Sequence, residues 1–270
     1  MIKALRWLSR QPAVMPLTAR LICARLVRES PRFFLGELLR SPGLGNYHVR
    51  ENGRTVIIRH RSVDSATLAE VFHHRWYFPP AEVEAAIGEP RLILDLGANI
   101  GLFGVVASSL WPAAQIVGYE PDPANAAVHA RTIEANDLGE RWTLVTEAAG
   151  AHDGQIRFVA GLGTSSHVLD VGDTSGPVAP IVVAKRDVMA AIASADLVKI
   201  DIEGGEWEIL GDPRFAAAPP RALVIEYHPE GCPEDDPHAA AEQALSAAGL
   251  RTTPIWEGAD GVGMLWASRS

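Results

Sequence analysis

The sequence predicts an α/β fold built on a mostly parallel β-sheet, and three observations support that prediction. A short apolar run at 92–96 ends in a glycine turn and is followed at once by an apolar helical stretch. From there the pattern alternates between short apolar strands and helices, which is typical of parallel sheets. Near the C-terminus two strand-like runs follow each other across a turn, so we expect an antiparallel edge on this sheet.

The N-terminal eighty residues differ from the rest. The first forty read as helical pieces bounded by prolines, with one helical face formed by Leu17, Leu21, Ala24 and Val27. An Asn-Gly pair at 52–53, between two alternating runs, indicates a β-hairpin. A helical pattern over 64–78 ends in an aromatic run at 76–78, which is placed either to cover a ligand or simply to pack.

We therefore divide the chain into two parts. Residues 1–80 form an N-terminal helical and hairpin extension, for which we consider the roles of a lid, a docking element or an oligomerisation element. Residues 81–270 form the main domain, because the regular alternation of strands and helices falls within them.

The main domain contains five predicted core strands with helices between them. Pro121-Asp122-Pro123 is a helix-start signal, and Gly249 marks a helix end. A loop rich in Gly, Ser, Thr and Asp occupies 161–176, between two shorter strand pieces. The predicted core strands are 92–96, 115–120, 142–146, 197–202 and 222–227, the helices 100–109, 124–136 and 238–248, and the last two strands 250–256 and 262–267.

The charge is unevenly distributed. The net charge is −9. Residues 1–61 contain 12 Lys or Arg and 3 Asp or Glu, whereas residues 62–270 contain 12 and 30. An acidic main domain argues against a nucleic-acid substrate, because phosphates would be repelled. The basic segment could contact an anionic membrane surface, but we favour docking on the acidic body or pairing with a second copy.

The cysteines and the apolar runs indicate in which cellular compartment the protein is expected. Cys23 and Cys232 lie far apart and form no disulfide framework and no metal-ligand spacing, so we expect a reducing, cytoplasmic setting. No apolar run is long enough to span a membrane, and the N-terminal residues lack the pattern of a secretory signal.

Acidic residues stand at the ends of all five predicted core strands. Ligands of open parallel sheets sit beyond these carboxyl ends. Such a ring of acids would repel a pyrophosphate and would suit a cationic ligand. The residues are Asp95, Glu120 with Asp122, Glu147, Asp201 with Glu203, and Glu226.

The turn after the first strand restricts the class of ligand further. Its spacing, Gly97-x-x-x-Gly101, is not the Gly-x-Gly-x-x-Gly of dinucleotide binders, and Asp95 stands where a phosphate would bind. Glu120, at the end of the next strand, is placed to accept hydrogen bonds from a ribose diol. Together these residues fit an adenosine with a positively charged tail, and S-adenosylmethionine has that combination.

These motifs resemble the FkbM-type S-adenosylmethionine-dependent methyltransferases, over roughly 92–227. The run with Lys199, Asp201 and Glu203 is the most specific. The resemblance implies a Rossmann-like, seven-stranded class I methyltransferase sheet, and O-methylation of a hydroxyl on a sugar, a polyketide or another small natural product. The matching runs are 94–101, Tyr119-Glu120-Pro121-Asp122-Pro123, Gly163-Thr164-Ser165-Ser166-His167 and 198–206.

The resemblance also implies roles for particular positions. Glu120 would bind the ribose hydroxyls, with help from Asp122, and Glu147 and Ala148 would border the adenine. The methionine part of the cofactor would be lined by Asp95, Gly97, Asn99 and Gly101.

The methyl acceptor is expected at the end of the fourth core strand. Strand alternation would place Lys199, Asp201 and Glu203 on one face, and a buried lysine needs a partner, for which Asp201 is the obvious choice. Methyl transfer to a hydroxyl requires alignment and removal of the alcohol proton. The candidate bases are Asp201, Glu203 and His228. A magnesium ion held by Asp201, Glu203 and Glu226 or His228 is an alternative that the spacing does not require, so we assign no metal.

Two other functions stay open at this point. An NAD-linked oxidoreductase is weakened by Asp95 and by the missing third glycine. A non-catalytic cofactor-binding or membrane-associated scaffold is weakened by the intact acids at 201 and 203. We expect the acceptor to be a small-molecule or glycosidic hydroxyl. No sequence motif indicates which one, or what the oligomeric state is.

Overall fold

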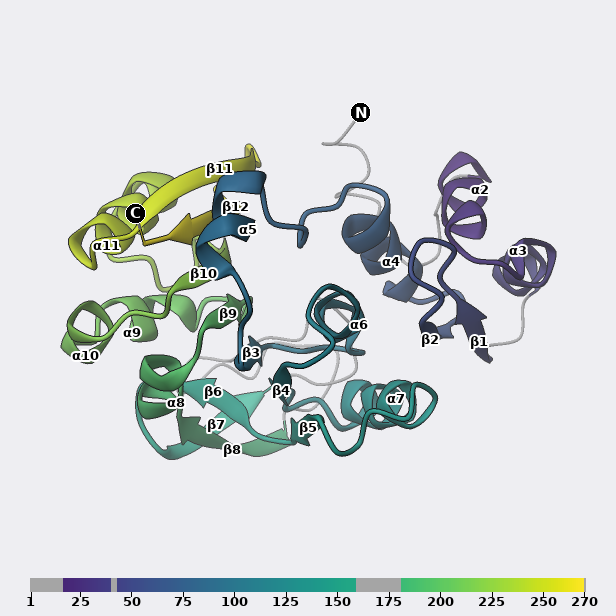
Figure 1. Ribbon diagram of the computed structural model, residues 1–270, viewed down its shortest axis with the longest axis horizontal. Helices are drawn as coiled ribbons and strands as arrows, with labels where there is room; N and C mark the ends of the chain where they lie inside the picture. Colours follow the sequence, from purple (N-terminus) through teal and green to yellow (C-terminus); the bar gives the residue numbers. More distant parts are fainter. Residues whose placement is uncertain (1–16, 40–42, 159–180, 270) are drawn as a thin grey trace.

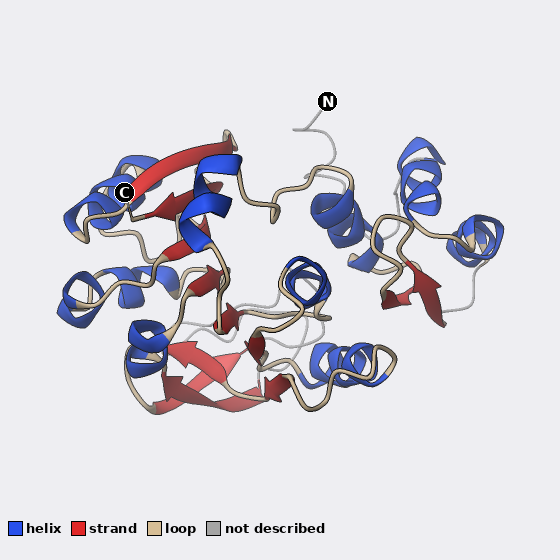
Figure 2. Cartoon of the chain, in the orientation of Figure 1, coloured by secondary structure: helices blue, strands red, loops and turns tan. Residues whose placement is uncertain are grey.

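A computed structural model describes residues 17–39, 43–158 and 181–269. Seven strands form the central sheet in the order β11-β12-β10-β9-β3-β4-β5 (Figure 1). Figure 2 shows helices packed on both sides of these strands. The strands are β3 Leu92–Leu96, β4 Gln115–Tyr119, β5 Trp142–Val145, β9 Leu197–Ile200, β10 Ala222–Tyr227, β11 Arg251–Glu257 and β12 Gly263–Ser268.

The strand directions confirm the predicted α/β sheet and its antiparallel C-terminal pair. Strands β5, β4, β3, β9 and β10 are parallel to one another, and β12 is antiparallel to both β10 and β11. Strand β12 lies between β10 and β11, so the last strand of the chain is inserted into the sheet rather than added at its edge.

Side chains of the central strands alternate between two apolar cores, as a period of two residues dictates. Ile93 and Leu197 face one core, which they share with α6 and α7, whereas Leu94 and Val198 face the other. The helices that flank the sheet are α5 Ala81–Ile87, α6 Leu102–Leu110, α7 Pro123–Glu134, α8 Met189–Ser194, α9 Glu206–Leu210, α10 Pro213–Ala217 and α11 Pro237–Ala247.

The N-terminal extension shares the first of these cores. Figure 1 shows it at one end of the molecule, beside α6 and α7. Cys23, Phe33 and Leu68 belong to the same apolar cluster as Val105 of α6. The extension's elements are α2 Leu17–Leu26, α3 Ser30–Leu38, β1 Leu44–His48, β2 Thr55–Arg59 and α4 Asp64–Phe72.

Two details of the extension differ from expectation. On α2 the residues that pack inward are Ala19, Cys23 and Ala24, whereas Leu17 and Leu21 are exposed within the described part of the chain. Helix α4 ends at Phe72 instead of continuing through the aromatic run at 76–78. The aromatic run then follows in an irregular segment, whose course is governed by packing against the sheet domain: Trp266 Nε1 donates to the Trp76 carbonyl at 3.2 Å.

A smaller sheet follows the third core strand. It has the order β6-β8-β7, from β6 Ala148–Gly150, β7 Gly154–Phe158 and β8 Ile181–Asp187. The loop predicted at 161–176, with its Gly163–His167 motif, lies outside the described residues. Among those that are described, no helix combines the length and the apolar character needed to cross a bilayer.

Candidate active site

The carboxyl ends of β3, β9 and β10 meet where the strand order reverses. From β3 the chain proceeds outward through β4 and β5, and then returns to the other side of β3 to form β9 and β10. Connections leave in opposite directions at such a point, which opens a crevice in which α/β proteins bind ligands. Most of the predicted site residues follow these strands or the neighbouring end of β4.

The turn after β3 is held open by left-handed backbone. Gly97 has φ +78°, Asn99 +49° and Gly101 +87°. A Cβ on Gly97 would lie 1.8 Å from the Asp201 carbonyl oxygen, so glycine lets β3 and the end of β9 approach each other. Below Gly101 the space is filled by the ring of His129. The Asn99 side-chain oxygen, Oδ1, is buried without a hydrogen-bond partner among the described residues.

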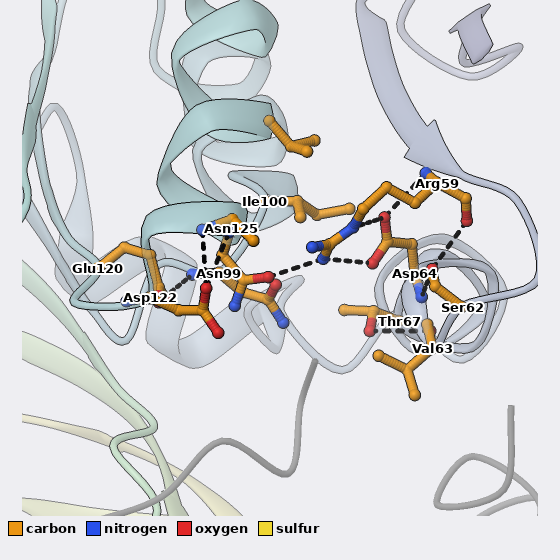
Figure 3. Close-up of polar contacts among 12 residues, drawn as sticks. Arg59, Ser62, Val63, Asp64, Thr67, Asn99, Ile100, Glu120, Asp122 and Asn125 are labelled. Atoms are coloured by element: carbon orange, nitrogen blue, oxygen red, sulfur yellow. Dashed lines mark hydrogen bonds and ion pairs between the residues drawn. The ribbon is translucent and has the colours of Figure 1, made fainter. Parts of the chain in front are cut away.

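Glu120 links this turn to the next helix. Its carboxylate accepts the Asn99 N–H at 2.7 Å and the Asp122 N–H at 2.8 Å. Burial raises the pKa of Glu120 to about 7, although these two backbone donors act in the opposite direction. Asp122 in turn caps α7 by accepting the Ala124 and Asn125 N–H groups (Figure 3).

The extension is tied to the same region through Arg59 at the end of β2. Figure 3 shows its guanidinium between α4 and α7. It donates two bonds to Asp64, at 2.9 and 2.8 Å, and one to Asn125 Oδ1 at 2.7 Å. Asn125 stands in the first turn of α7, which Asp122 caps, so Arg59 connects the extension to the helix beside Glu120.

Lys199 is buried between two carboxylates. Its Nζ lies 3.3 Å from Asp95 Oδ1 and 3.4 Å from Asp201 Oδ2, and it donates to the Gly97 carbonyl at 2.5 Å. Asp95 and Lys199 are register partners in β3 and β9, which places them side by side on one face. Burial by itself lowers the pKa of Lys199, but Asp201 and Asp95 outweigh it and raise that pKa.

Asp201 and Glu203 lie close together, with carboxylate oxygens within 4.8 Å of each other, but strand alternation is not the reason. Strand β9 ends at Ile200, and Asp201 and Glu203 lie in the loop before α9. Glu203 has φ +53° and Gly204 has φ +98°, so the loop turns sharply instead of continuing the strand. Asp201 still faces Lys199, as expected, because the loop begins directly at the strand end.

His228 follows β10 and is surrounded by carboxylates. Its Nδ1 lies 2.5 Å from Glu206 Oε1, and its Nε2 lies 3.4 Å from Glu203 Oε2 and 3.8 Å from Glu226 Oε1. Burial alone would lower the pKa of His228, but Glu206 and the other carboxylates raise it to about 10. The ring is therefore protonated at neutral pH in this state, unlike the free imidazole expected of a general base.

The pKa of the Glu203 carboxyl is also raised, here mainly by burial. Burial raises its pKa to about 8, and the nearby carboxylates of Asp201, Glu226 and Glu206 add to the effect, whereas His228 lowers it. Like charges that share a site in this way favour proton uptake or a bound cation.

Glu147 is placed away from this cluster. It forms a two-bond ion pair with Arg186 of β8, at 2.7 and 3.0 Å, and that pair lowers its pKa. Ala148 is buried at the start of β6. Both follow the carboxyl end of β5, so the backbone there lies at the predicted strand end while the Glu147 side chain is already paired.

Three contributors were not predicted as site residues. Tyr77, from the aromatic run, donates its hydroxyl to Asp201 Oδ2 at 3.3 Å. Glu206 orients His228, and it is fully buried. His129 fills the space under Gly101, and burial lowers its pKa to about 3, so it is neutral. The aromatic run and the position of Glu206 within 198–206 were visible in the sequence, whereas nothing marked His129.

The donors and acceptors of this crevice fit S-adenosylmethionine. Glu120 retains lone pairs for hydroxyl donors, and the unpartnered Asn99 Oδ1 can accept from an ammonium group. Asp201 and Glu203, which are partly exposed, place carboxylates beside the turn, and this suits a positive ligand. The glycines of the turn have no side chains, so none occupies the space beside the backbone there.

The sheet order, the position at the switch point and the acidic side chains are those expected of a class I S-adenosylmethionine-dependent methyltransferase. The model of the methyltransferase FkbM domain matches residues 95–251, more than half of the chain. The chain therefore belongs to the FkbM methyltransferase family, and S-adenosylmethionine is its cofactor.

More distant similarities are partial. A ribosomal RNA small subunit methyltransferase H from Synechococcus sp. (strain RCC307) is 31% identical over 109 residues, which cover 38% of this chain and 36% of that protein. The chain thus spans about a third of the length of this curated relative.

Solved structures show low identity. P. horikoshii TYW2 in complex with MeSAdo is 16% identical, covers 86% of this chain and 74% of that chain, and gives a TM-score of 0.42. M. jannaschii TYW2 in complex with AdoMet is 12% identical, covers 86% and 89%, and gives 0.41. Precorrin-6y C5,15-methyltransferase from Geobacter metallireducens GS-15 is 14% identical, covers 70% and 87%, and gives 0.40.

The raised pKa of Glu120 predicts a pH-dependent cofactor affinity. We propose that the ribose hydroxyls donate to the ionised Glu120 carboxylate, so that binding favours loss of the proton that Glu120 carries below its pKa of about 7. We expect affinity for S-adenosylmethionine to be higher at about pH 8 than at about pH 6, with proton release in between. Calorimetry in buffers of different ionisation enthalpy measures both.

A Glu120→Ala variant supplies the control. It should bind the cofactor roughly 10- to 100-fold more weakly, because the hydroxyls lose a charged acceptor. It should also lose the pH dependence. An affinity that is the same at both pH values in the unmodified protein would show that Glu120 does not bind the ribose.

Proposed function

We propose that this chain transfers the methyl group of S-adenosylmethionine to a hydroxyl of a small or glycosidic acceptor. The supporting observation is the position of Asp201 and Glu203 beside the glycine turn that follows β3. Gly97 of this turn packs directly against the Asp201 backbone. Carboxylate oxygens there can accept a hydrogen bond from an acceptor hydroxyl and take up its proton. When bound, the cofactor supplies an electrophilic methyl group on a sulfonium.

The chain's own residues divide the work in this proposal. Glu120, with help from Asp122, holds the ribose hydroxyls, and Asp95, Asn99 and the glycine turn hold the amino-acid tail. Lys199 holds Asp95 and Asp201 in place, since it lies within 3.4 Å of both carboxylates. Tyr77 covers Asp201 and limits the water that reaches it, because it is itself almost completely buried.

The electrostatics of the site favour Asp201 as the proton acceptor in this proposal. His228 carries a proton at neutral pH, because its pKa is raised to about 10. It is therefore a weaker candidate base than Asp201. Glu203, whose pKa is raised to about 8, is also largely protonated at neutral pH. In this proposal Asp201 accepts the hydroxyl proton and His228 balances the negative charge around it.

The class of acceptor follows from charge. The main domain is strongly acidic, and the crevice presents carboxylates from three strand ends, so a polyanionic nucleic acid is disfavoured as substrate. A neutral or cationic acceptor with hydroxyl groups avoids that repulsion. Contacts of the basic extension with an anionic surface or with a second copy of the chain belong to the same proposal as secondary possibilities.

The direct test uses calorimetry and label transfer. We expect the full chain to bind S-adenosylmethionine and not NAD, and to transfer a labelled methyl group to a hydroxyl within a panel of sugars, polyketides and phenols. Mass spectrometry of the product locates the methyl group on oxygen or nitrogen. Binding of NAD alone would refute the assignment, and methylation confined to nitrogen acceptors would refute O-methylation.

A further inference from the structure

We propose that Asp201, Glu203 and His228 form a binding site for a divalent transition-metal ion, for which Mn²⁺ is a suitable probe. Each residue offers one ligand atom, and the three atoms lie within 4.8 Å of one another. Ligands on opposite sides of an ion bound at about 2.0–2.2 Å are roughly 4–4.4 Å apart. A small side-chain rotation would therefore close the shell around an ion.

The His228 ring is oriented as a metal ligand would be. A buried carboxylate, Glu206, contacts Nδ1 at 2.5 Å and so directs Nε2 toward Glu203 and Asp201. Metal-bound histidines commonly have a carboxylate on their other nitrogen, which sets the tautomer and the ring orientation. The second oxygen of Glu206, Oε2, is buried with no hydrogen-bond partner among the described residues.

Apart from the 2.5 Å contact between His228 Nδ1 and Glu206, the ion-pair contacts within the cluster are longer than ordinary charged hydrogen bonds. The distance from His228 Nε2 to Glu203 Oε2 is 3.4 Å, that to Glu226 Oε1 is 3.8 Å, and Lys199 Nζ lies 3.4 Å from Asp201. Hydrogen bonds between such groups are normally 2.7–2.9 Å long. A self-sufficient ion-pair network would be expected to close these gaps, whereas a site for an ion leaves room between its ligands.

Charge balance points the same way. Four carboxylates surround His228 and the head of Lys199, and Lys199 is shared with the buried Asp95. The negative charges outnumber the positive ones at the acceptor side of the crevice. A divalent ion would neutralise this excess and would replace the Nε2 proton of His228, which passes to solvent on binding.

The donor set selects the kind of ion. Two carboxylates and one imidazole suit Mn²⁺, Fe²⁺ or Zn²⁺ better than Mg²⁺ or Ca²⁺, which prefer oxygen ligands alone. Three protein ligands leave coordination positions open for substrate or water. The chemical use of the ion rests on the proposed O-methylation: a hydroxyl bound to it loses its proton more readily. Binding of the ion does not depend on that function.

The test measures ion binding without any turnover. Metal-free full-length protein, with no cofactor added, is titrated with Mn²⁺, and the free ion is counted by electron paramagnetic resonance. We expect one ion per chain with a dissociation constant below about 1 mM. Glu203→Gln and His228→Gln should each weaken binding by about 10-fold or more, since each removes a ligand.

A control variant and a check of folding accompany the Mn²⁺ titration. Glu242→Gln removes a carboxylate beside another histidine, His238 on α11, and should leave Mn²⁺ binding unchanged. A cooperative thermal unfolding transition shows that each variant is folded, and Glu203→Gln decides alone if His228→Gln does not fold. Absence of binding at 1 mM Mn²⁺, a value at the weak end of biological sites, would overturn the site, as would equal binding by the variants.

The two proposals fail separately. Methyl transfer to a hydroxyl without Mn²⁺ binding would leave the proposed function intact and overturn the metal site. Mn²⁺ binding that depends on Glu203 and His228, together with no transfer to any hydroxyl, would support the site and overturn O-methylation.

Discussion

Gly97→Ala is expected to destabilise the fold by about 3 kcal/mol or more and to abolish cofactor binding. A Cβ at this position would lie 1.8 Å from the Asp201 carbonyl oxygen, a backbone atom that cannot rotate away. The left-handed backbone, with φ +78°, adds about 1 kcal/mol for a residue with a side chain. Forcing β3 and the end of β9 apart contributes the rest, as overpacking of a close contact does.

Urea unfolding and calorimetry with S-adenosylmethionine measure the two effects. Gly139→Ala is the matched control, because a Cβ there meets nothing within 4 Å and its φ is not in the left-handed range. It should change stability by less than about 0.5 kcal/mol. A Gly97→Ala protein as stable as the Gly139→Ala protein would contradict the close approach of the two strand ends.

Lys199→Met is expected to cost about 3–5 kcal/mol of stability at neutral pH, because it leaves a buried carboxylate without its partner. Asp95 is fully buried, and neither of its oxygens makes a hydrogen bond to a described residue, so the ammonium 3.3 Å away is what compensates its charge. The same change removes the cation beside Asp201. We therefore expect loss of activity together with loss of stability.

The pH dependence of the stability lost in Lys199→Met identifies the cause of that loss. Burial already raises the pKa of Asp95, and removal of Lys199 takes away the charge that opposes this. Asp95 then takes up a proton more readily, and the stability deficit should shrink as the pH falls toward about 4. Lys185→Met, which breaks the partly exposed pair with Glu208, should cost only about 0–1 kcal/mol. A deficit that does not change with pH would rule out the unpaired-carboxylate explanation.

The sheet and its strand ends were largely predictable. The apolar runs that begin at 92, 115, 142, 197 and 222 each form a strand, because a run of that length between turn signals has few alternatives in a chain that alternates with helices. The same local patterns located Asp95, Glu120 and Asp201 at strand ends. The FkbM resemblance, which rests on 94–101 and 198–206, agrees with the domain match over 95–251.

The predictions were weaker where packing decides the backbone. The fourth core strand was expected to continue to 202, and the pairing of Asp201 with Glu203 on one face was inferred from that extension. In the structure β9 ends at Ile200, and Glu203 reaches His228 from a left-handed loop position. Local alternation predicts strand faces only while the strand lasts.

Sequence alone determined the α/β class, the glycine turn, the acids at the strand ends and, through its motifs, the family. These features depend on neighbours along the chain, and local propensity and side-chain period carry that information. Tertiary structure alone decided that Lys199 lies between Asp95 and Asp201, that Tyr77 covers Asp201, that Arg59 ties the extension to α7, and that Glu203 and His228 face each other. Those contacts join residues far apart in sequence, and they depend on strand order, register and loop course, which no short stretch of the chain specifies.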